Sequence, residues 1–394
     1  MLRFLTAGES HGPSLTVIVE GLPSGLEIRE EEIADELARR RLGFGRGPRM
    51  RFERDVLRLT GGIRHGRTLG SPVAIEILNS EWPKWEVEMS AAPGTPTKKL
   101  TAPRPGHADL AGMQKYGFDD ARDVLERASA RETAARVVAG SLAKSLLATI
   151  GISVISHVVR IGSVAAPTDR RPSLHDLETV DQSEVRCFDE GTAQLMIAEI
   201  KAAAKQGDSL GGIAEVIAFG VPVGIGSHVH WDRKLDGLLA GALMSIQAVK
   251  AVEIGDGMVQ ASQRGSVAPD AIVRDEAAST GGGFARRSDH AGGLEGGISS
   301  GGPIIAKVAM KPLATLNRPV LETVDLTTGE STVSFKERTD VTAVPALGVV
   351  AEAMAALVLA SEAQRKFGGD SVAEFSRNYR SYVEQLGAAP SARE

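Results

Sequence analysis

Cysteine is almost absent from this sequence of 394 residues, in which Cys187 is the only thiol. A single cysteine excludes an internal disulfide framework and a metal cluster held by several thiolates, and it favours a reducing compartment. Aromatic residues make up only 4% of the chain, too few for a platform on which nucleic-acid bases stack. The formal charge of −5 provides no general positive field for nucleic acid or an acidic membrane. Any anion site must therefore be local.

Targeting and cofactor signatures are also missing. The first twelve residues lack the apolar stretch and cleavage site of a signal peptide, and we find no apolar run that reaches the length of a membrane span. We therefore expect a cytoplasmic protein that binds neither membrane nor nucleic acid. No strand leads into a G-x-G-x-x-G turn, and G-x-x-x-x-G-K-[ST], H-E-x-x-H and paired C-x-x-C motifs do not occur, so no metal site is expected.

Hydrophobic periodicity predicts a mixed α/β fold. Alternation predicts a strand over 14–20, and helical spacing predicts a helix from Glu30 to Leu42 that ends at Gly43. Capping-box spacing at Ser129 predicts a helix that continues to residue 151. The remaining predicted segments are an exposed loop over 86–105, a strand over 213–219, and helices over 232–252 and 349–359.

Two turns indicate an internal repeat. The segments GLPSGL at 21–26 and GVPVGI at 220–225 each follow a predicted strand and precede a predicted helix. Two similar layers of sheet and helix that share a core are therefore expected, with no linker between them. Residues 1–386 are expected to form a single domain, and 387–394 a disordered tail.

The segment GESHG at 8–12 matches the nucleophile elbow of serine hydrolases, in which Ser10 would be the nucleophile. Its context argues against this reading, because only seven residues precede Gly8 and a strand pattern, not a helix, follows. The turn still presents Ser10 and His11 side by side, and an imidazole can give a proton to a leaving phosphate near neutral pH. The alternative is a histidine that only satisfies turn carbonyls.

Arginine is concentrated between residues 39 and 54, where seven occur among glycines. Guanidinium groups in such a loop can bind phosphate and carboxylate bidentately, which favours a small substrate with several negative charges. A non-catalytic binder of polyanionic metabolites is the alternative from another class. A second pair, Arg127 and Arg131, stands at a predicted helix start, where a phosphate is expected to bind. His107 follows a rigid Pro-Gly turn, and the glycine-rich run 281–302 predicts close approach of backbone to a ligand.

Taken together and in this order, the segments resemble the chorismate synthase family from Met1 to about residue 370. The stretches that carry the resemblance are Gly8–Gly12, Glu126–Thr133 and Arg338–Asp340, supported by Arg104–Asp109, Ala291–Ile298 and Lys311–Pro312. The resemblance implies a bacterial-type, monofunctional carbon-oxygen lyase. Its reaction is the trans-1,4-elimination of phosphate from 5-enolpyruvylshikimate-3-phosphate to give chorismate, the seventh step of the shikimate pathway, which leads to the aromatic amino acids.

The resemblance also implies a fold and a cofactor. The fold is a β-α-β sandwich with helices between antiparallel sheets, and the assembly is a homotetramer. The reaction is redox-neutral but requires reduced FMN, which lends electron density to the breaking C–O bond. The flavin would be reduced by NADPH or by a separate flavin reductase.

Roles for individual residues follow from the resemblance alone. His11 would protonate the departing phosphate, His107 would stabilise the reduced flavin near N1, and Asp340 would act through flavin N5. Residues implied to bind or border the substrate are Ser10, Arg40, Arg46, Arg49, Arg131 and Arg338. Residues implied to bind FMN are Arg127, Ala128, Ser129, Gln247, Ala248, Gly296, Lys311, Pro312, Leu313, Ala314, Thr315 and Arg338. Arg40 and Arg46 also match positions associated with NADP, whereas Thr342 and Asp289 depart from the cysteine and asparagine common in the family.

Overall fold

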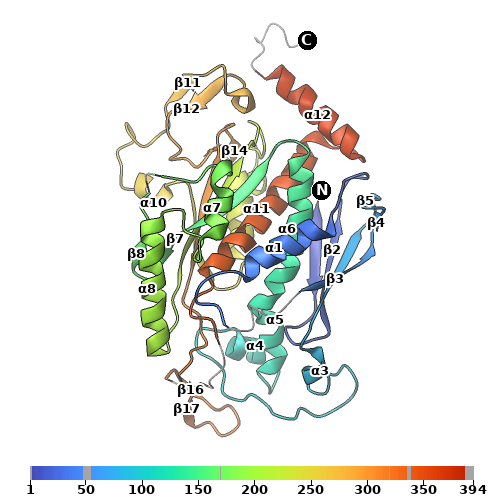
Figure 1. The fold of residues 1–394 in the computed structure, drawn as a ribbon, viewed down its shortest axis with the longest axis vertical. Coiled ribbons are helices and arrows are strands. Elements are labelled where there is room, and N and C mark those ends of the chain that lie inside the picture. Colours follow the sequence, from blue (N-terminus) through green and yellow to red (C-terminus); the bar gives the residue numbers. More distant parts are fainter. Residues whose placement is uncertain (1, 48–54, 169, 319, 335–338, 387–394) are drawn as a thin grey trace.

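The computed structural model describes residues 2–386 apart from 48–54, 169, 319 and 335–338. Two antiparallel sheets enclose a layer of long helices (Figure 1). The first sheet has the order β1-β2-β6-β3, with β1 (Arg3–Ala7), β2 (Ser14–Glu20), β3 (Val56–Gly61) and β6 (Val73–Leu78). The second has the order β10-β15-β9-β7-β8, with β7 (Ser153–Ile161), β8 (Val164–Ala165), β9 (Gly212–Phe219), β10 (Val249–Ile254) and β15 (Ile304–Met310).

The middle layer consists of α1 (Glu30–Arg41), α6 (Thr133–Ala148) and α11 (Val344–Phe367). α6 packs against β2 of the first sheet, and α11 packs against β7 and β9 of the second. α6 and α11 cross so closely that a side chain at Gly140 would collide with Ala353. The predicted sandwich of helices between two antiparallel sheets is therefore confirmed. Flanking helices are α8 (Glu190–Gln206), α9 (Leu235–Met244) and α12 (Val372–Gln385).

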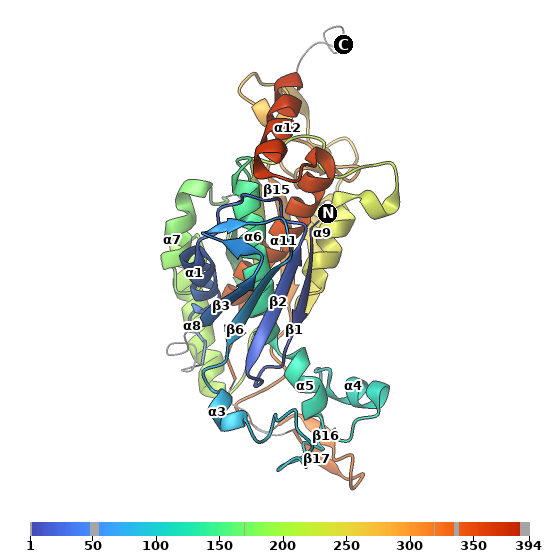
Figure 2. The same cartoon turned by 90° about the vertical axis from the view of Figure 1, so that its right-hand side faces the viewer.

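Shorter elements gather at the two ends of the sandwich. Both views place α3, α4, α5, β16 and β17 at one end, and α12 at the other (Figures 1 and 2). The short helices are α3 (Trp82–Trp85), α4 (Asp109–Tyr116), α5 (Arg122–Ala128), α7 (Leu177–Gln182) and α10 (Gly257–Gln260), and the 3-10 turns are η1 (Ala130–Glu132), η2 (Leu174–Asp176), η3 (Trp231–Arg233) and η4 (Ser279–Gly281). The short strands are β4 (Ile63–Arg64), β5 (Arg67–Thr68), β11 (Ile272–Arg274), β12 (Phe284–Arg286), β13 (Leu294–Glu295), β14 (Ile298–Ser299), β16 (Glu322–Val324) and β17 (Ser331–Val333).

The topology confirms the predicted repeat. The order β1-β2-α1-β3-β6-α6 corresponds to β7-β9-α9-β10-β15-α11, and equivalent strands occupy equivalent places in the two sheets. The turns that suggested the repeat also match, since Gly21 and Gly220 have φ of +93° and +75°. The residue after each glycine, Leu22 or Val221, is buried in the same hydrophobic cluster. Both repeats thus contribute side chains to one core.

Most predicted elements agree with the structure, but one helix was wrong. The segment 232–252 contains α9 only from Leu235 to Met244, and β10 begins at Val249. Ala248, between them, has a left-handed φ of +65°, which a continuing helix does not allow. The helix predicted from Ser129 begins as η1 and continues as α6 to Ala148.

The longest helix corrects the expectation that no segment reaches the length of a membrane span. A window of α11 has a mean hydropathy of 1.9, so by length and composition alone this helix could cross a bilayer. In the fold, 89% of that window is buried inside the protein. The same apolar length therefore serves as the central core helix.

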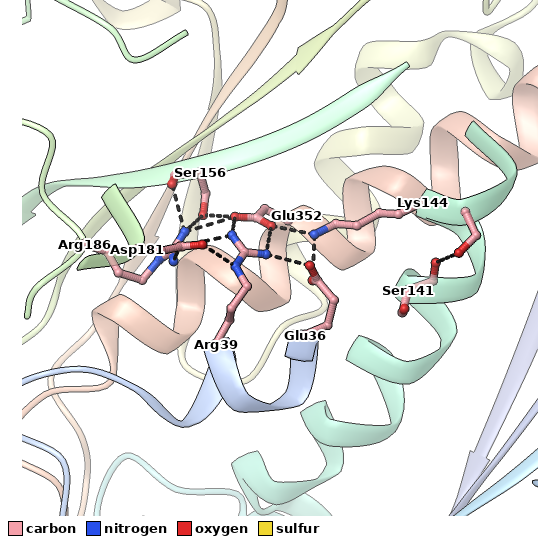
Figure 3. A network of polar contacts seen from close by, with 9 residues as sticks. Glu36, Arg39, Ser141, Lys144, Ser156, Asp181, Arg186 and Glu352 are labelled. Carbon is pink, nitrogen blue, oxygen red and sulfur yellow. Dashed lines mark hydrogen bonds and ion pairs between the residues drawn. The ribbon is translucent and has the colours of Figure 1, made fainter. Parts of the chain in front are cut away.

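One carboxylate lies at the middle of this apolar helix (Figure 3). Glu352 is fully buried and accepts hydrogen bonds from Arg39 (2.8 and 3.0 Å), Lys144 (2.6 Å), Ser156 (2.6 Å) and Arg186 (3.2 Å). Burial by itself would raise the pKa of the carboxyl, but the surrounding positive charges outweigh burial and hold the pKa well below its usual range. The cluster joins α1, α6, β7 and α11.

Candidate active site

His11 lies in the turn between β1 and β2, at the end of the sandwich that carries α5. Its Nδ1 is 2.9 Å from Oε1 of Glu126, and its backbone N–H donates to Oε2 of the same residue at 2.9 Å. Burial would raise the pKa of the Glu126 carboxyl, but hydrogen bonds and charge from His11, together with the charge of Arg122, lower it. An ionised carboxylate only accepts, so Nδ1 of His11 carries a proton. No hydrogen bond to Nε2 is found among the residues that the structure describes.

Ser10 occupies the same turn but not the geometry of a hydrolase. Its hydroxyl accepts a hydrogen bond from the Ser129 hydroxyl at 3.2 Å, and its backbone N–H donates to the carbonyl of Glu126 at 3.0 Å. The turn connects two antiparallel strands, whereas a nucleophile elbow leads from a strand into a helix. The structure thus gives the hydrolase alternative no support. Ser129 also accepts from the backbone N–H of Arg131, which brings that predicted substrate residue to the same junction.

His107 precedes α4 and is held by a buried ion pair. Its Nδ1 is hydrogen-bonded to Asp109, a fully buried carboxylate that also accepts from Nε of Arg104 at 2.8 Å. Burial opposes ionisation of Asp109, but the hydrogen bonds from His107 and Arg104 dominate and hold its pKa well below its usual range. About a fifth of the His107 side chain remains exposed, at 21%. The imidazole is therefore fixed on one side and accessible on another.

The segment Lys311–Thr315 follows β15 and lies against the His107 turn. The ammonium group of Lys311 donates to the carbonyl of Gly106, and Nη1 of Arg104 donates to the Thr315 hydroxyl at 3.1 Å. Gly106 has φ +74°, a conformation that suits glycine. The predicted flavin segment and the predicted flavin-stabilising histidine are thus neighbours.

Asp340 is held by the arginine-rich loop. Its Oδ1 accepts from the backbone N–H of Gly47 at 2.7 Å, and its Oδ2 is 3.2 Å from Nη1 of Arg46. The adjacent Val341 donates to the carbonyl of Gly45 at 2.8 Å, so three residues of the loop are attached to the segment before α11. Thr342, one of the departures from the family pattern, is buried beside Gly45.

Arg127 and Gln247 line a cavity of about 380 Å³ together with Thr6, Glu132, Arg136 and Ser245. Arg127 donates to the carbonyls of Gly8 and Thr6 at 3.0 and 2.9 Å, and Gln247 donates from its amide to Glu132 at 2.9 Å. The next residue, Ala248, accepts from the backbone N–H of Lys311 at 3.0 Å. Two of the sequence segments implied in flavin binding therefore meet here.

A continuous set of contacts connects the predicted proton carriers. The side chain of Gln247 donates to Glu132, which lies near Ser129 and His11. The next residue, Ala248, accepts from the backbone N–H of Lys311, whose side chain contacts the His107 turn. On the other side, the Ser209 hydroxyl donates to the carbonyl of Leu313 at 2.9 Å, and Leu210 donates to the carbonyl of Val341 at 2.7 Å. His11, His107 and Asp340 therefore stand on segments that are hydrogen-bonded into one framework.

Some predicted residues are not brought together. Gly296 lies in the β13–β14 hairpin, whose Gly297 accepts from Leu235 at the start of α9, whereas Gln247 follows the other end of that helix. The two ends of a ten-residue helix are about 15 Å apart. Arg40 is buried near the end of α1. Arg49 and Arg338 lie outside the described residues.

Asp289 is half-buried on a different part of the fold, near Asp256, Asp270 and Arg171. Burial raises the pKa of its carboxyl, and the two aspartates raise it further. Asp289 therefore lies apart from the framework that carries His11 and His107.

Sequence reasoning missed the groups that hold the two imidazoles. Glu126 and Asp109 were part of the matched stretches but received no role, although Asp109 stands only two residues after His107 and could have been recognised by that spacing. Glu126 is separated from His11 by 115 residues, so no local spacing pointed to the pair. Trp85, whose ring centroid lies 4.0 Å from that of His11, carried no signal at all.

Comparisons with known proteins give matches that extend over almost the whole chain. The family model described as chorismate synthase matches residues 2–363. A chorismate synthase of Salinispora tropica is 58% identical and one of Streptomyces coelicolor 57% identical, with at least 98% of each chain covered. A solved structure titled "Crystal Structure of Chorismate Synthase" has a TM-score of 0.79 at 39% identity, covering 98% of this chain and 99% of that one. This chain belongs to the chorismate synthase family.

Proposed function

We propose that this enzyme catalyses the trans-1,4-elimination of phosphate from 5-enolpyruvylshikimate-3-phosphate to give chorismate. Family membership supports the reaction class. The observation that carries the proposal is the framework in which His11, His107 and Asp340 are each held by an oppositely charged or hydrogen-bonding neighbour while part of each side chain stays exposed, at 21%, 21% and 23%. Groups that transfer protons need both a fixed direction and access to the reactant.

The residues at this end of the fold are suited to reduced FMN. The cavity offers the guanidinium groups of Arg127 and Arg136 and the hydroxyls of Thr6 and Ser245. Oε1 of Gln247 is buried without a hydrogen-bond partner among the described residues. Such an acceptor matches an N–H or O–H donor of a flavin. Arg127, Ala128, Ser129, Gln247, Ala248 and Lys311–Thr315 would hold it, with Gly296 and Arg338 as further family positions. When bound, reduced FMN supplies transient electron density to the C–O bond that breaks.

His11 acts on the leaving group. Glu126 accepts the proton on Nδ1, so Nε2 is the nitrogen that can give a proton to the departing phosphate. The ionised carboxylate balances the positive charge whenever the ring carries both protons. Ser10 and Arg131, attached through Ser129 to the same junction, orient the phosphate. Transfer from a fixed imidazole avoids the reorganisation that a mobile acid would require.

His107 and Asp340 act on the other side of the reaction. His107, held by Asp109 and Arg104, would hold the cofactor on its N1 side, and Asp340 would take up the proton that leaves C6 of the substrate on the N5 side. Arg46 neutralises Asp340 and, with Arg40, would bind the negative groups of the substrate. Arg49 and Arg338, which lie outside the described residues, are further positions that the family resemblance implies for the two carboxylates and the phosphate. Several fixed guanidinium groups orient a trianion without reorganising during the reaction.

Wider features of the enzyme belong to the same proposal. We infer that residues 1–386 form one domain, because both repeats share a single core cluster. From the family resemblance we also infer a cytoplasmic homotetramer. The flavin is reduced by a separate reductase or by NADPH, for which Arg40 and Arg46 are the family positions.

The deciding experiment measures phosphate release under anaerobic conditions. We expect turnover of 5-enolpyruvylshikimate-3-phosphate with reduced FMN and none with oxidised FMN or without flavin. Binding of the substrate without phosphate release would instead support a non-catalytic binder. Turnover in the absence of reduced flavin would overturn the proposal.

A further inference from the structure

Trp85 forms a direct contact with the proposed acid that no motif indicated. Its ring is stacked on the His11 imidazole, with centroids 4.0 Å apart and planes 28° apart. Trp85 is the last residue of α3, and its backbone carbonyl accepts from Met89 at 2.8 Å. Stacked rings at this separation are in van der Waals contact over most of the smaller ring. One face of the imidazole is thus covered.

The short helix that carries Trp85 is attached to the histidine turn itself. Asn79 is buried, and its side-chain amide donates to the carbonyl of Gly12 at 2.8 Å. Its backbone N–H donates to Pro13 at 3.0 Å, and its carbonyl accepts from Trp82 at 3.1 Å. A single residue therefore connects α3 to the segment that follows His11. This link fixes the start of α3, and with it Trp85, relative to the turn that carries the imidazole.

Arg122 joins the same group from α5. Its guanidinium carbon lies 5.0 Å from the Trp85 ring centroid, and its Nη1 donates to Oε1 of Glu126 at 3.0 Å. Glu126 in turn accepts from His11. The four side chains form a closed ring of contacts in which the indole touches both a permanent cation and an imidazole.

The two contacts of His11 constrain different motions. The hydrogen bond from Nδ1 to Glu126 fixes one atom but leaves the ring able to rotate about that bond, whereas stacking fixes the plane. Together they direct Nε2 along one line. We infer that Trp85 is a positioning residue for His11, which keeps Nε2 aimed at the leaving phosphate. This inference rests on the proposed function, because it assumes that His11 is the acid.

The contact can be measured without any turnover, by tryptophan fluorescence. A protonated imidazole in contact with an indole quenches its emission. His230 is near Trp231, with centroids 6.1 Å apart, so the measurement uses a Trp231→Phe background to remove that second pair. At one fixed, mildly acidic pH we therefore expect emission to rise when His11 is replaced by Asn. The rise on His11→Asn should disappear in a Trp85→Phe background, and it should remain in a Trp82→Phe background.

The positioning role is tested by steady-state kinetics with reduced FMN. We expect Trp85→Leu to lower kcat by about 10- to 100-fold, the range of a modest misplacement of a reacting group, with KM for the substrate changed less than about twofold. Trp85→Phe retains a ring that can stack and should recover most of the rate. Circular dichroism and flavin affinity should match the parent protein.

The outcomes separate this inference from the proposed function. Normal kcat in Trp85→Leu, or an emission that His11→Asn leaves unchanged, would refute the positioning role while leaving the reaction intact. Absence of phosphate release from the parent protein would refute the reaction and with it the role, even if the fluorescence contact persisted. A rate loss in Trp85→Leu that Trp85→Phe does not restore would show that volume, not stacking, is what matters, and would also overturn the inference.

Discussion

Two buried carboxylates, Glu352 and Glu126, show how similar charge clusters can serve different ends. Both accept several hydrogen bonds from cationic side chains, and both have a pKa below the usual value for glutamate. Glu352 is fully enclosed between α1, α6, β7 and α11, and its partner Lys144 makes a second ion pair with Glu36 at 2.7 Å (Figure 3). Glu126 holds an imidazole that is still 21% exposed.

The difference lies in where the donors point. Around Glu352, each arginine or lysine side chain pairs with at least two carboxylates of the cluster, and we call this cluster closed. Around Glu126 one nitrogen of His11 faces away from the cluster. A closed cluster can only contribute to stability or to the choice of fold, whereas an open one presents a positioned group to a ligand. The comparison predicts that mutations in the first cluster chiefly change stability, and that mutations in the second change the reaction rate and change stability less.

The largest expected effect is on the closed cluster. Replacing Glu352 by Ala leaves Arg39, Lys144 and Arg186 without their shared counter-charge, and we expect a loss of about 3–5 kcal/mol in the free energy of unfolding. Glu352→Gln keeps the shape and some hydrogen bonds and should lose less. Denaturant unfolding measures both. A loss under about 1 kcal/mol in Glu352→Ala would remove the basis of the comparison.

The second prediction concerns two other side chains that, like His11, are held on one side and partly exposed, His107 and Asp340. We expect His107→Ala and Asp340→Asn each to lower kcat at least about a hundredfold, because both groups handle protons or stabilise charge in the proposed reaction. Both variants should fold, as judged by circular dichroism and thermal melting. Near-normal rates in both would show that the open geometry has no catalytic meaning.

A smaller effect is expected from the pH dependence of stability at Glu126. Since the pKa of this carboxyl is lowered in the folded state, its ionised form contributes stability above the unfolded pKa of about 4.3, and this contribution is lost as pH falls through the folded pKa. Glu126→Gln should therefore be less stable than the parent at pH 7, by about 1–3 kcal/mol, with a difference that shrinks below about pH 4. A difference independent of pH would contradict this sign.

The smallest effect provides the baseline. Arg274 and Glu276 form an ion pair at 3.2 Å in which the side chains are 79% and 85% exposed. We expect Arg274→Ala to change the unfolding free energy by less than about 1 kcal/mol and to leave kcat unchanged. A larger change would mean that charge pairing alone, without burial, accounts for the behaviour of the other two clusters.

Local sequence patterns were sufficient for much of the fold. Alternation and glycine-proline turns predicted β2, β9 and the repeat, because these features depend on residues close together in the chain. They failed for 232–252, where apolar residues recur on both sides of the left-handed Ala248 that separates a helix from a strand. For α11 they predicted only residues 349–359 of a helix that runs from Val344 to Phe367, because local patterns do not show how far the packing extends it.

The sequence by itself determined which chemical groups this protein has: the GESHG and Pro-Gly-His turns, the arginine-rich loop and the family to which the chain belongs. Only the tertiary structure decided which groups act on one another. Glu126 reaches His11 across 115 residues, and Arg39 reaches Glu352 across 313. Such pairs are set by how α1, α5, α6 and α11 pack, and hydrophobic packing is non-directional, so it leaves no local trace in the spacing of the charged residues.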